Sequence, residues 1–199
     1  EVLERPSSAV KELVENSLDA NSEKIDIFVR NGGKTEIKIL DNGHGMTKED
    51  LKMSIMRHAT SKFNNENFSE IKTHGFRGEA LPAIGAVAKM NIISKTEKSD
   101  NGFEINVNSG NISNIKPIAR ERGTTVTIKD IFFSTPARLK FLKSEKHENY
   151  LIKKLIQKLA ICNFNTRFQL QINQKMIMIT KKNNSQGQME NLKSRIVDC

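Results

Sequence analysis

The segment KELVENSLDA (11–20) holds two pairs of polar residues whose spacing would let either pair address one small ligand. Glu12 and Asn16 are four positions apart, and so are Glu15 and Asp19, so in a helix the members of each pair share one face. Glu12 and Asn16 would point away from the apolar stripe of this helix, which leaves room for a ligand. A solvated helix face explains either pair equally well. Spacing alone therefore does not choose between them.

Two glycine-rich segments follow whose residue types suit a nucleotide. Asp41 opens DNGHG (41–45), in which Gly43 and Gly45 would let the backbone approach a planar ligand. A carboxylate at that point can accept a hydrogen bond from the exocyclic amine of a purine. GFRGEAL (75–81) places two glycines before a helix start, where free N–H groups and the helix dipole favour phosphate. Each segment alone could be a tight turn, but together with the first they indicate an ATP site. The common phosphate loop GxxxxGK[ST] does not occur in this sequence.

Helices and strands must position these residues, and their patterns alternate along the chain. Apolar spacing predicts a helix over about 8–19, and a hairpin joins strands 25–30 and 35–40 across Asn31-Gly32-Gly33. A helix capped by Thr47, with Asp50 completing a capping box, runs through Arg57. The polar stretch 58–74 is expected to be a long lid-like loop. The remaining expected elements are a short helix over 78–90, four strands between 91 and 132, a helix over 145–160 and a hairpin over 167–180.

This order of elements predicts an α+β fold: a two-layer α/β sandwich with a mixed, mainly antiparallel sheet. We expect one domain over 1–188 and the truncated start of a following subdomain over 189–199, with 181–188 as the boundary. Since residue 1 is not Met, we expect a piece of a longer chain. No targeting segment and no apolar run of roughly 20 residues is present, so we expect a soluble intracellular protein without a membrane partner.

The formal net charge of +9 has two explanations. It can reflect a compositional bias toward Lys, or it can attract nucleic acid phosphates without regard to base sequence. Basic residues concentrate between Arg120 and Lys158. The expected DNA contacts are Arg138, Lys140 and Lys143.

The chemistry-bearing segments, in this order and spacing, resemble the GHKL ATPase superfamily, which has the Bergerat-type fold. ERPSSAVKELVENSLDA (4–20), HATSK (58–62), GFRGEAL and FFSTPARLKFL (132–142) resemble its DNA mismatch repair MutL branch, over essentially the whole chain. Gyrase B, the heat-shock chaperone and the histidine kinases lack the HATSK and TPARxKF elements. The expected location is thus the cytoplasm of a bacterium or the nucleus of a eukaryote.

The resemblance implies a role for each matching residue. Glu12 matches the general base that activates water, and Asn16 the ligand of Mg²⁺ on the ATP phosphates, which selects this pair over Glu15 and Asp19. Asp41 matches the adenine-reading carboxylate, which Thr124 supports from a neighbouring strand. The other implied nucleotide contacts are Gly43, Gly45 and Met46, the lid residues Thr60, Ser61 and Lys62, and the phosphate loop Gly75, Phe76, Arg77, Gly78, Glu79, Ala80 and Leu81.

The resemblance also implies a cycle: Mg-ATP binding, lid closure, dimerisation of two copies, signalling to mismatch-recognition and downstream repair proteins, and slow hydrolysis. This chain departs from the family at Ser134, usually Asn, and at Pro82, and we expect neither to touch nucleotide. In the family, a segment before Glu1 reaches the second copy and a following subdomain supplies a lysine, so hydrolysis is expected to be weak here. The rival interpretations are a topoisomerase or chaperone ATPase of the same fold and a basic DNA-binding module with a vestigial ATP site.

Overall fold

The computed structural model describes residues 3–56, 79–181 and 195–198, and a single mixed sheet organises them. The strand order is β5-β4-β3-β7-β2-β1-β8-β9, and β6 pairs with the edge of β4. Only the pairing of β1 with β8 is parallel among these strands. The strands are β1 (Lys24–Arg30), β2 (Glu36–Asp41), β3 (Lys89–Lys95), β4 (Gly102–Asn108), β5 (Asn111–Ile112), β6 (Lys116–Ile118), β7 (Gly123–Lys129), β8 (Arg167–Ile172) and β9 (Lys175–Ile179).

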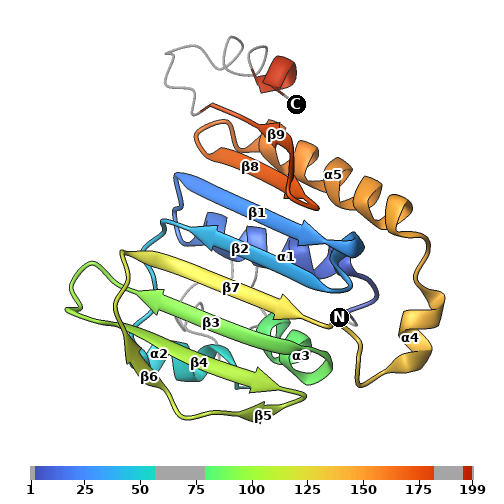
Figure 1. The fold of residues 1–199 in the computed structure, drawn as a ribbon. Helices are drawn as coiled ribbons and strands as arrows, with labels where there is room; N and C mark the ends of the chain where they lie inside the picture. The colour runs from blue at the N-terminus through green and yellow to red at the C-terminus, as the bar shows by residue number, and fades with distance from the viewer. Residues whose placement is uncertain (1–2, 57–78, 182–194, 199) are drawn as a thin grey trace, which may run out of the picture.

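Helices cover one face of this sheet, as Figure 1 shows, and complete the two-layer α+β sandwich that the sequence predicts. The central helix α1 lies behind β1 and β2, α5 lies toward β8, and α3 lies behind β3 and β4. The helices are α1 (Pro6–Asp19), α2 (Lys48–Ser54), α3 (Ala80–Val87), α4 (Pro136–Phe141) and α5 (Glu145–Cys162), with a 3-10 turn η1 (Asn31–Gly33) between β1 and β2.

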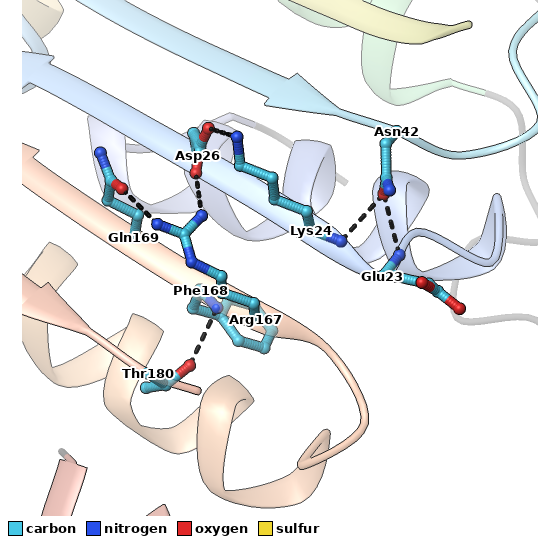
Figure 2. A network of polar contacts seen from close by, with 8 residues as sticks. All are labelled: Glu23, Lys24, Asp26, Asn42, Arg167, Phe168, Gln169 and Thr180. Atoms are coloured by element: carbon cyan, nitrogen blue, oxygen red, sulfur yellow. Dashed lines mark hydrogen bonds and ion pairs between the residues drawn. The ribbon is translucent and has the colours of Figure 1, made fainter. Parts of the chain in front are cut away.

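The core forms where alternating strand residues meet the helices. Ile25, Ile27 and Val29 of β1 are at most 1% exposed, and the residues between them point to the other face. That other face carries a polar network, shown in Figure 2. Arg167 of β8 lies 3.1 Å from Asp26 of β1, and Lys24 lies 2.9 Å from the same carboxylate. This one-sided burial explains why the strands alternate in sequence.

Most of the expected elements are confirmed, with shifted ends. Helix α1 begins at Pro6 rather than at residue 8, because proline suits the first helical position. The Thr47 capping box is present, but α2 ends at Ser54 instead of reaching Arg57, which lies outside the described residues. The Ser54 hydroxyl donates to the Leu51 carbonyl oxygen (2.9 Å), a local bond that competes with helix continuation.

Three further differences concern short elements. Helix α4 was not predicted, since six residues are too few for a periodic pattern. Residues 111–118, expected to form one of the four strands between 91 and 132, form two short edge strands, β5 and β6. Pro117 is tolerated in β6 because an edge strand needs fewer donors. The expected short helix ends at Val87, so Lys89 and Met90 belong to β3.

The described C-terminal turn, 195–198, packs on the loop between α5 and β8. Arg195 is fully buried there, and its guanidinium donates to the Thr166 carbonyl oxygen (3.0 Å). The expected domain boundary at residue 188 lies outside the described residues. In the part of the chain that is described, we find no helix long and apolar enough to cross a membrane.

Candidate nucleotide-binding site

Asp41 ends β2, and both of its carboxylate oxygens are held by neighbouring elements. Oδ1 accepts from the backbone N–H groups of Gly43 (2.9 Å) and Thr124 (3.2 Å), and Oδ2 accepts from the Ser17 hydroxyl (3.0 Å). Thr124 is also the register partner of Asp41 across the β2–β7 ladder. The structure therefore brings together Asp41 and Thr124, two of the residues that the sequence singled out, and adds Ser17 of α1.

Burial raises the pKa of the Asp41 carboxyl above its ordinary value of 3.8, and the hydrogen bonds from Gly43, Ser17 and Thr124 oppose this increase. The nearby Arg120 guanidinium has its own pKa lowered by burial, an effect that attraction to Asp41 opposes. Burial and fixed hydrogen-bond donors at the end of a strand are typical of a carboxylate in a functional site.

The loop after β2 is fastened to three different elements. The His44 N–H donates to the Ala20 carbonyl oxygen at the end of α1 (3.0 Å), and Arg122 Nε donates to the Gly43 carbonyl oxygen (3.0 Å). The Met46 N–H donates to the Ser94 hydroxyl of β3 (2.8 Å). This loop is consequently fixed on all sides within the described residues.

Gly45 serves this loop differently from what the sequence suggests. Its φ is +72°, and a Cβ at this position would lie 2.0 Å from the Lys95 carbonyl oxygen. The close approach that requires glycine is thus to the backbone at the end of β3, whereas the sequence suggested an approach to a ligand. Asn42 is structural as well, since its Oδ1 accepts from the N–H groups of Glu23 and Lys24 (2.9 Å each; Figure 2).

The two candidate pairs of α1 have different surroundings. Glu15 is buried, and its carboxylate lies 2.8 Å from Lys11 Nζ. Glu12 is half-buried, and its carboxylate lies 3.7 Å from the same ammonium group. Asn16 is followed one turn later by Ala20, whose carbonyl oxygen accepts from the His44 N–H in the loop after β2. Glu12 and Asn16 remain the pair that the family resemblance selects.

The expected phosphate loop is described only at its end. Glu79 precedes α3, and Ala80 and Leu81 form its first turn. An apolar cavity of about 310 Å³ lies between α2, α3 and β4, and it shares only Leu81 with the expected site. Its apolar lining does not suit phosphate. Thr60, Ser61, Lys62, Gly75, Phe76, Arg77 and Gly78 lie outside the described residues.

The side-chain oxygens of Glu12 and Asn16 decide whether this site suits a magnesium ion. Among the described residues there is no group of three His, Cys, Asp or Glu side chains that could hold a metal ion. The amide oxygen of Asn16 and the carboxylate of Glu12 are hard oxygen donors. Mg²⁺ usually keeps several waters and takes one or two protein ligands plus substrate phosphates. The donor set therefore fits a magnesium ion that arrives with a nucleotide.

The three expected DNA contacts lie on or just after α4 and are not equivalent. Arg138 is half-buried, donates to the Leu3 carbonyl oxygen (3.2 Å) and lies 5.8 Å from the centre of the Phe132 ring. Lys140 and Lys143 are exposed. Lys140 and Lys143 are therefore open to a partner, whereas part of the Arg138 guanidinium is engaged within the chain.

Sequence reasoning missed three residues that shape the site: Ser17, Ser94 and Arg122. Ser17 and Ser94 each occupy a buried position in an otherwise apolar pattern. Ser17 lies on the buried side of α1, and Ser94 follows Met90 and Ile92 on the buried face of β3. A polar residue at such a position was the available signal, since buried hydroxyls need partners. Arg122 gave no signal because its contact depends on the path of the loop before β7.

The sequence of this chain matches a known ATPase family and proteins of DNA mismatch repair. Residues 4–131 match the family described as histidine kinase-, DNA gyrase B- and HSP90-like ATPase. The buried carboxylate at the end of β2 and the helix-covered mixed sheet thus belong to an ATPase domain of that class. Proteins described as DNA mismatch repair protein MutL are 50% identical in Rhizobium etli over 170 residues, and 45% identical in Rickettsia typhi over 198 residues. These alignments cover 85% and 100% of this chain but 28% and 33% of the relatives.

Solved structures also match this chain as an ATPase domain of the MutL type. The MutL ATPase domain of Aquifex aeolicus complexed with ADP is 31% identical, with a TM-score of 0.81, and the match covers 98% of this chain and 70% of that one. The chain therefore belongs to the MutL family of DNA mismatch repair proteins, as a representative of its ATPase domain. It spans at most about a third of the length of the curated relatives cited above.

Proposed function

We propose that this chain binds Mg-ATP and hydrolyses it slowly, as the nucleotide switch of a MutL-type mismatch repair protein. The observation that carries the proposal is Asp41, whose buried carboxylate joins α1, the loop after β2 and β7. It can accept a hydrogen bond from the exocyclic amine of adenine. The ADP complex of the related Aquifex aeolicus domain supports a nucleotide as the ligand.

Hydrolysis is assigned to α1. Glu12 acts as the general base that removes a proton from the attacking water, and Asn16 would hold a magnesium ion that arrives with the nucleotide. The bound ion would neutralise phosphate charge. The chain supplies the amide oxygen of Asn16 as its ligand, and α1 carries that side chain. Glu79, Ala80 and Leu81, at the start of α3, contribute to the phosphate side together with the loop before them.

Binding is proposed to drive closure over the nucleotide by Thr60, Ser61 and Lys62, dimerisation with a second copy, and signalling to mismatch-recognition and downstream repair proteins. Relatives described as DNA mismatch repair protein MutL support a role in mismatch repair, and the steps of this cycle are the proposal. Non-specific DNA contact through Lys140 and Lys143 belongs to the same proposal, because both side chains are exposed and basic.

The test is a titration of the chain with ATP and with GTP, each with and without Mg²⁺, followed by phosphate release. We expect ATP to bind with magnesium and GTP to bind poorly. Asn16→Ala should lose the magnesium-dependent part of ATP affinity. Asp19→Ala, on the same helix, is the control and should retain it. Equal affinities for ATP and GTP would remove the assigned adenine contact.

A further inference from the structure

Ser94 lies at a junction that the family assignment does not explain. It is fully buried on β3, and its hydroxyl oxygen has three polar neighbours. The Met46 N–H lies 2.8 Å away, the Thr124 hydroxyl oxygen 2.8 Å away and the Gly123 carbonyl oxygen 3.2 Å away. We propose that Ser94 is a specificity-determining positioning residue, which acts by fixing the direction of the Thr124 hydroxyl. The inference rests on the proposed adenine site.

The proton balance sets that direction. A hydroxyl has one proton to donate and two lone pairs to accept with. The Met46 N–H can only donate, and the Gly123 carbonyl can only accept. If Ser94 donates to Gly123, it accepts from both Met46 and Thr124, and all of these groups are satisfied. If Ser94 instead donated to Thr124, the Gly123 carbonyl would lose this donor. The first arrangement is favoured because it makes one more buried hydrogen bond within the protein.

In the satisfied arrangement the Thr124 proton is used within the protein. Thr124 then offers only lone pairs to the site, beside the carboxylate of Asp41, its register partner. Two acceptors side by side suit the exocyclic amine of adenine. They disfavour a purine that carries a carbonyl oxygen at the same ring position, such as hypoxanthine or guanine. Without the Ser94 hydroxyl, Thr124 could turn and donate, and a carbonyl would then be tolerated.

The experiment measures the Kd values of ATP and ITP, which differ at that ring position, for the whole chain and for Ser94→Ala. We expect ATP affinity to fall several-fold and the ATP-to-ITP preference to narrow by roughly tenfold, as the loss of one buried hydrogen-bond orientation implies. In a Thr124→Val background, which lacks the hydroxyl, Ser94→Ala should not narrow the preference further.

A matched control lies directly after β9, at the far edge of the same sheet. Thr180 is also fully buried, and its hydroxyl accepts from the Phe168 N–H at 2.9 Å (Figure 2). Thr180→Val should lower the free energy of unfolding without changing the ATP-to-ITP preference. This separates an effect on specificity from a loss of one buried hydroxyl.

The outcomes separate the two proposals. If the unmodified chain binds neither nucleotide, the proposed function and this inference both fail. If it prefers ATP and Ser94→Ala keeps the same preference, the inference alone is overturned. Ser94→Cys keeps a side-chain group that can donate and accept but weakens both hydrogen-bonding roles, so it replaces Ser94→Ala should the alanine variant not fold. An unchanged preference in the cysteine variant would equally overturn the inference.

Discussion

The Ser17 hydroxyl lies 3.0 Å from Oδ2 of Asp41, and this contact joins the middle of the site to α1. Ser17 follows Asn16 directly and lies five residues after Glu12. The carboxylate assigned to adenine and the side chains assigned to hydrolysis are therefore held by one rigid helix. The two proposed roles, base reading and phosphate chemistry, would thus be connected through fewer than two turns of α1.

Replacing Asp41 with Asn should lower ATP affinity by roughly tenfold or more, because an amide NH₂ in place of an acceptor leaves a buried mismatch that costs on the order of 1–3 kcal/mol. Calorimetric titration measures this change. Asp26→Asn, the same substitution on the open face of the sheet, is the control and should bind ATP normally. Normal ATP binding by the Asp41 variant would contradict the adenine contact.

The raised pKa of Asp41 predicts a pH dependence with a defined sign. The ionised carboxylate is the stronger acceptor for the adenine amine, so ATP affinity should fall as the pH decreases through this raised pKa. The folded state also holds the proton more tightly than the unfolded state, so this group's contribution to stability is lost as the pH rises from about 3.8 through the folded value. Both dependences should be missing in Asp41→Asn, measured by titration and urea unfolding across the acidic range.

Glu12→Ala should retain ATP binding and lose turnover by about 10²–10⁴, the usual effect of removing a positioned general base. Phosphate release under saturating ATP is the measurement. Glu15→Ala is the control from the same helix, since Glu15 is engaged by Lys11 at 2.8 Å. Hydrolysis at the unmodified rate in the Glu12 variant would remove it from this role.

DNA contact should be tested with Lys140→Glu and Lys143→Glu together, because Arg138 is needed for its contact with Leu3. We expect weak, sequence-independent binding, roughly 10⁻⁴–10⁻⁶ M, which falls with salt at a slope near −0.9 per neutralised phosphate. The double variant should bind less and show a shallower slope, with ATP affinity unchanged. Fluorescence anisotropy across salt concentrations measures both. If the double variant and the unmodified chain show the same salt slope, these lysines do not contact DNA and the net charge of +9 reflects composition alone.

Asn42→Ala should lower the free energy of unfolding by about 0.5–1.5 kcal/mol, because the side chain accepts from two backbone N–H groups of β1's start. The ATP-to-GTP preference should stay the same, because the Asn42 side chain accepts from Glu23 and Lys24 and from none of the groups that hold the Asp41 carboxylate. Urea unfolding and nucleotide titration together check this. A lost preference would give Asn42 a role in the site.

The sequence predicted the fold because its periodicities are local. The β1–β2 hairpin, the Thr47 capping box and α5 are each encoded within a few consecutive residues. The pairing of Asp41 with Thr124 needed the family resemblance, since no local pattern places β7 beside β2. Ser94 and Arg122 could not be predicted, because their partners are brought near only by the strand order and the loop paths.

The parallel pairing of β1 with β8 also bears on how the chain reaches its folded state. Lys24 pairs with Arg167, 143 positions later, and Asp26 and Arg167 complete that ladder on the open face. Contacts that are so distant in sequence close slowly, because the entropy of the intervening chain is lost before they form. During synthesis, one edge of β1 therefore lacks its partner until nearly the whole domain has emerged. For this ATPase domain, the risk of aggregation is concentrated in that interval.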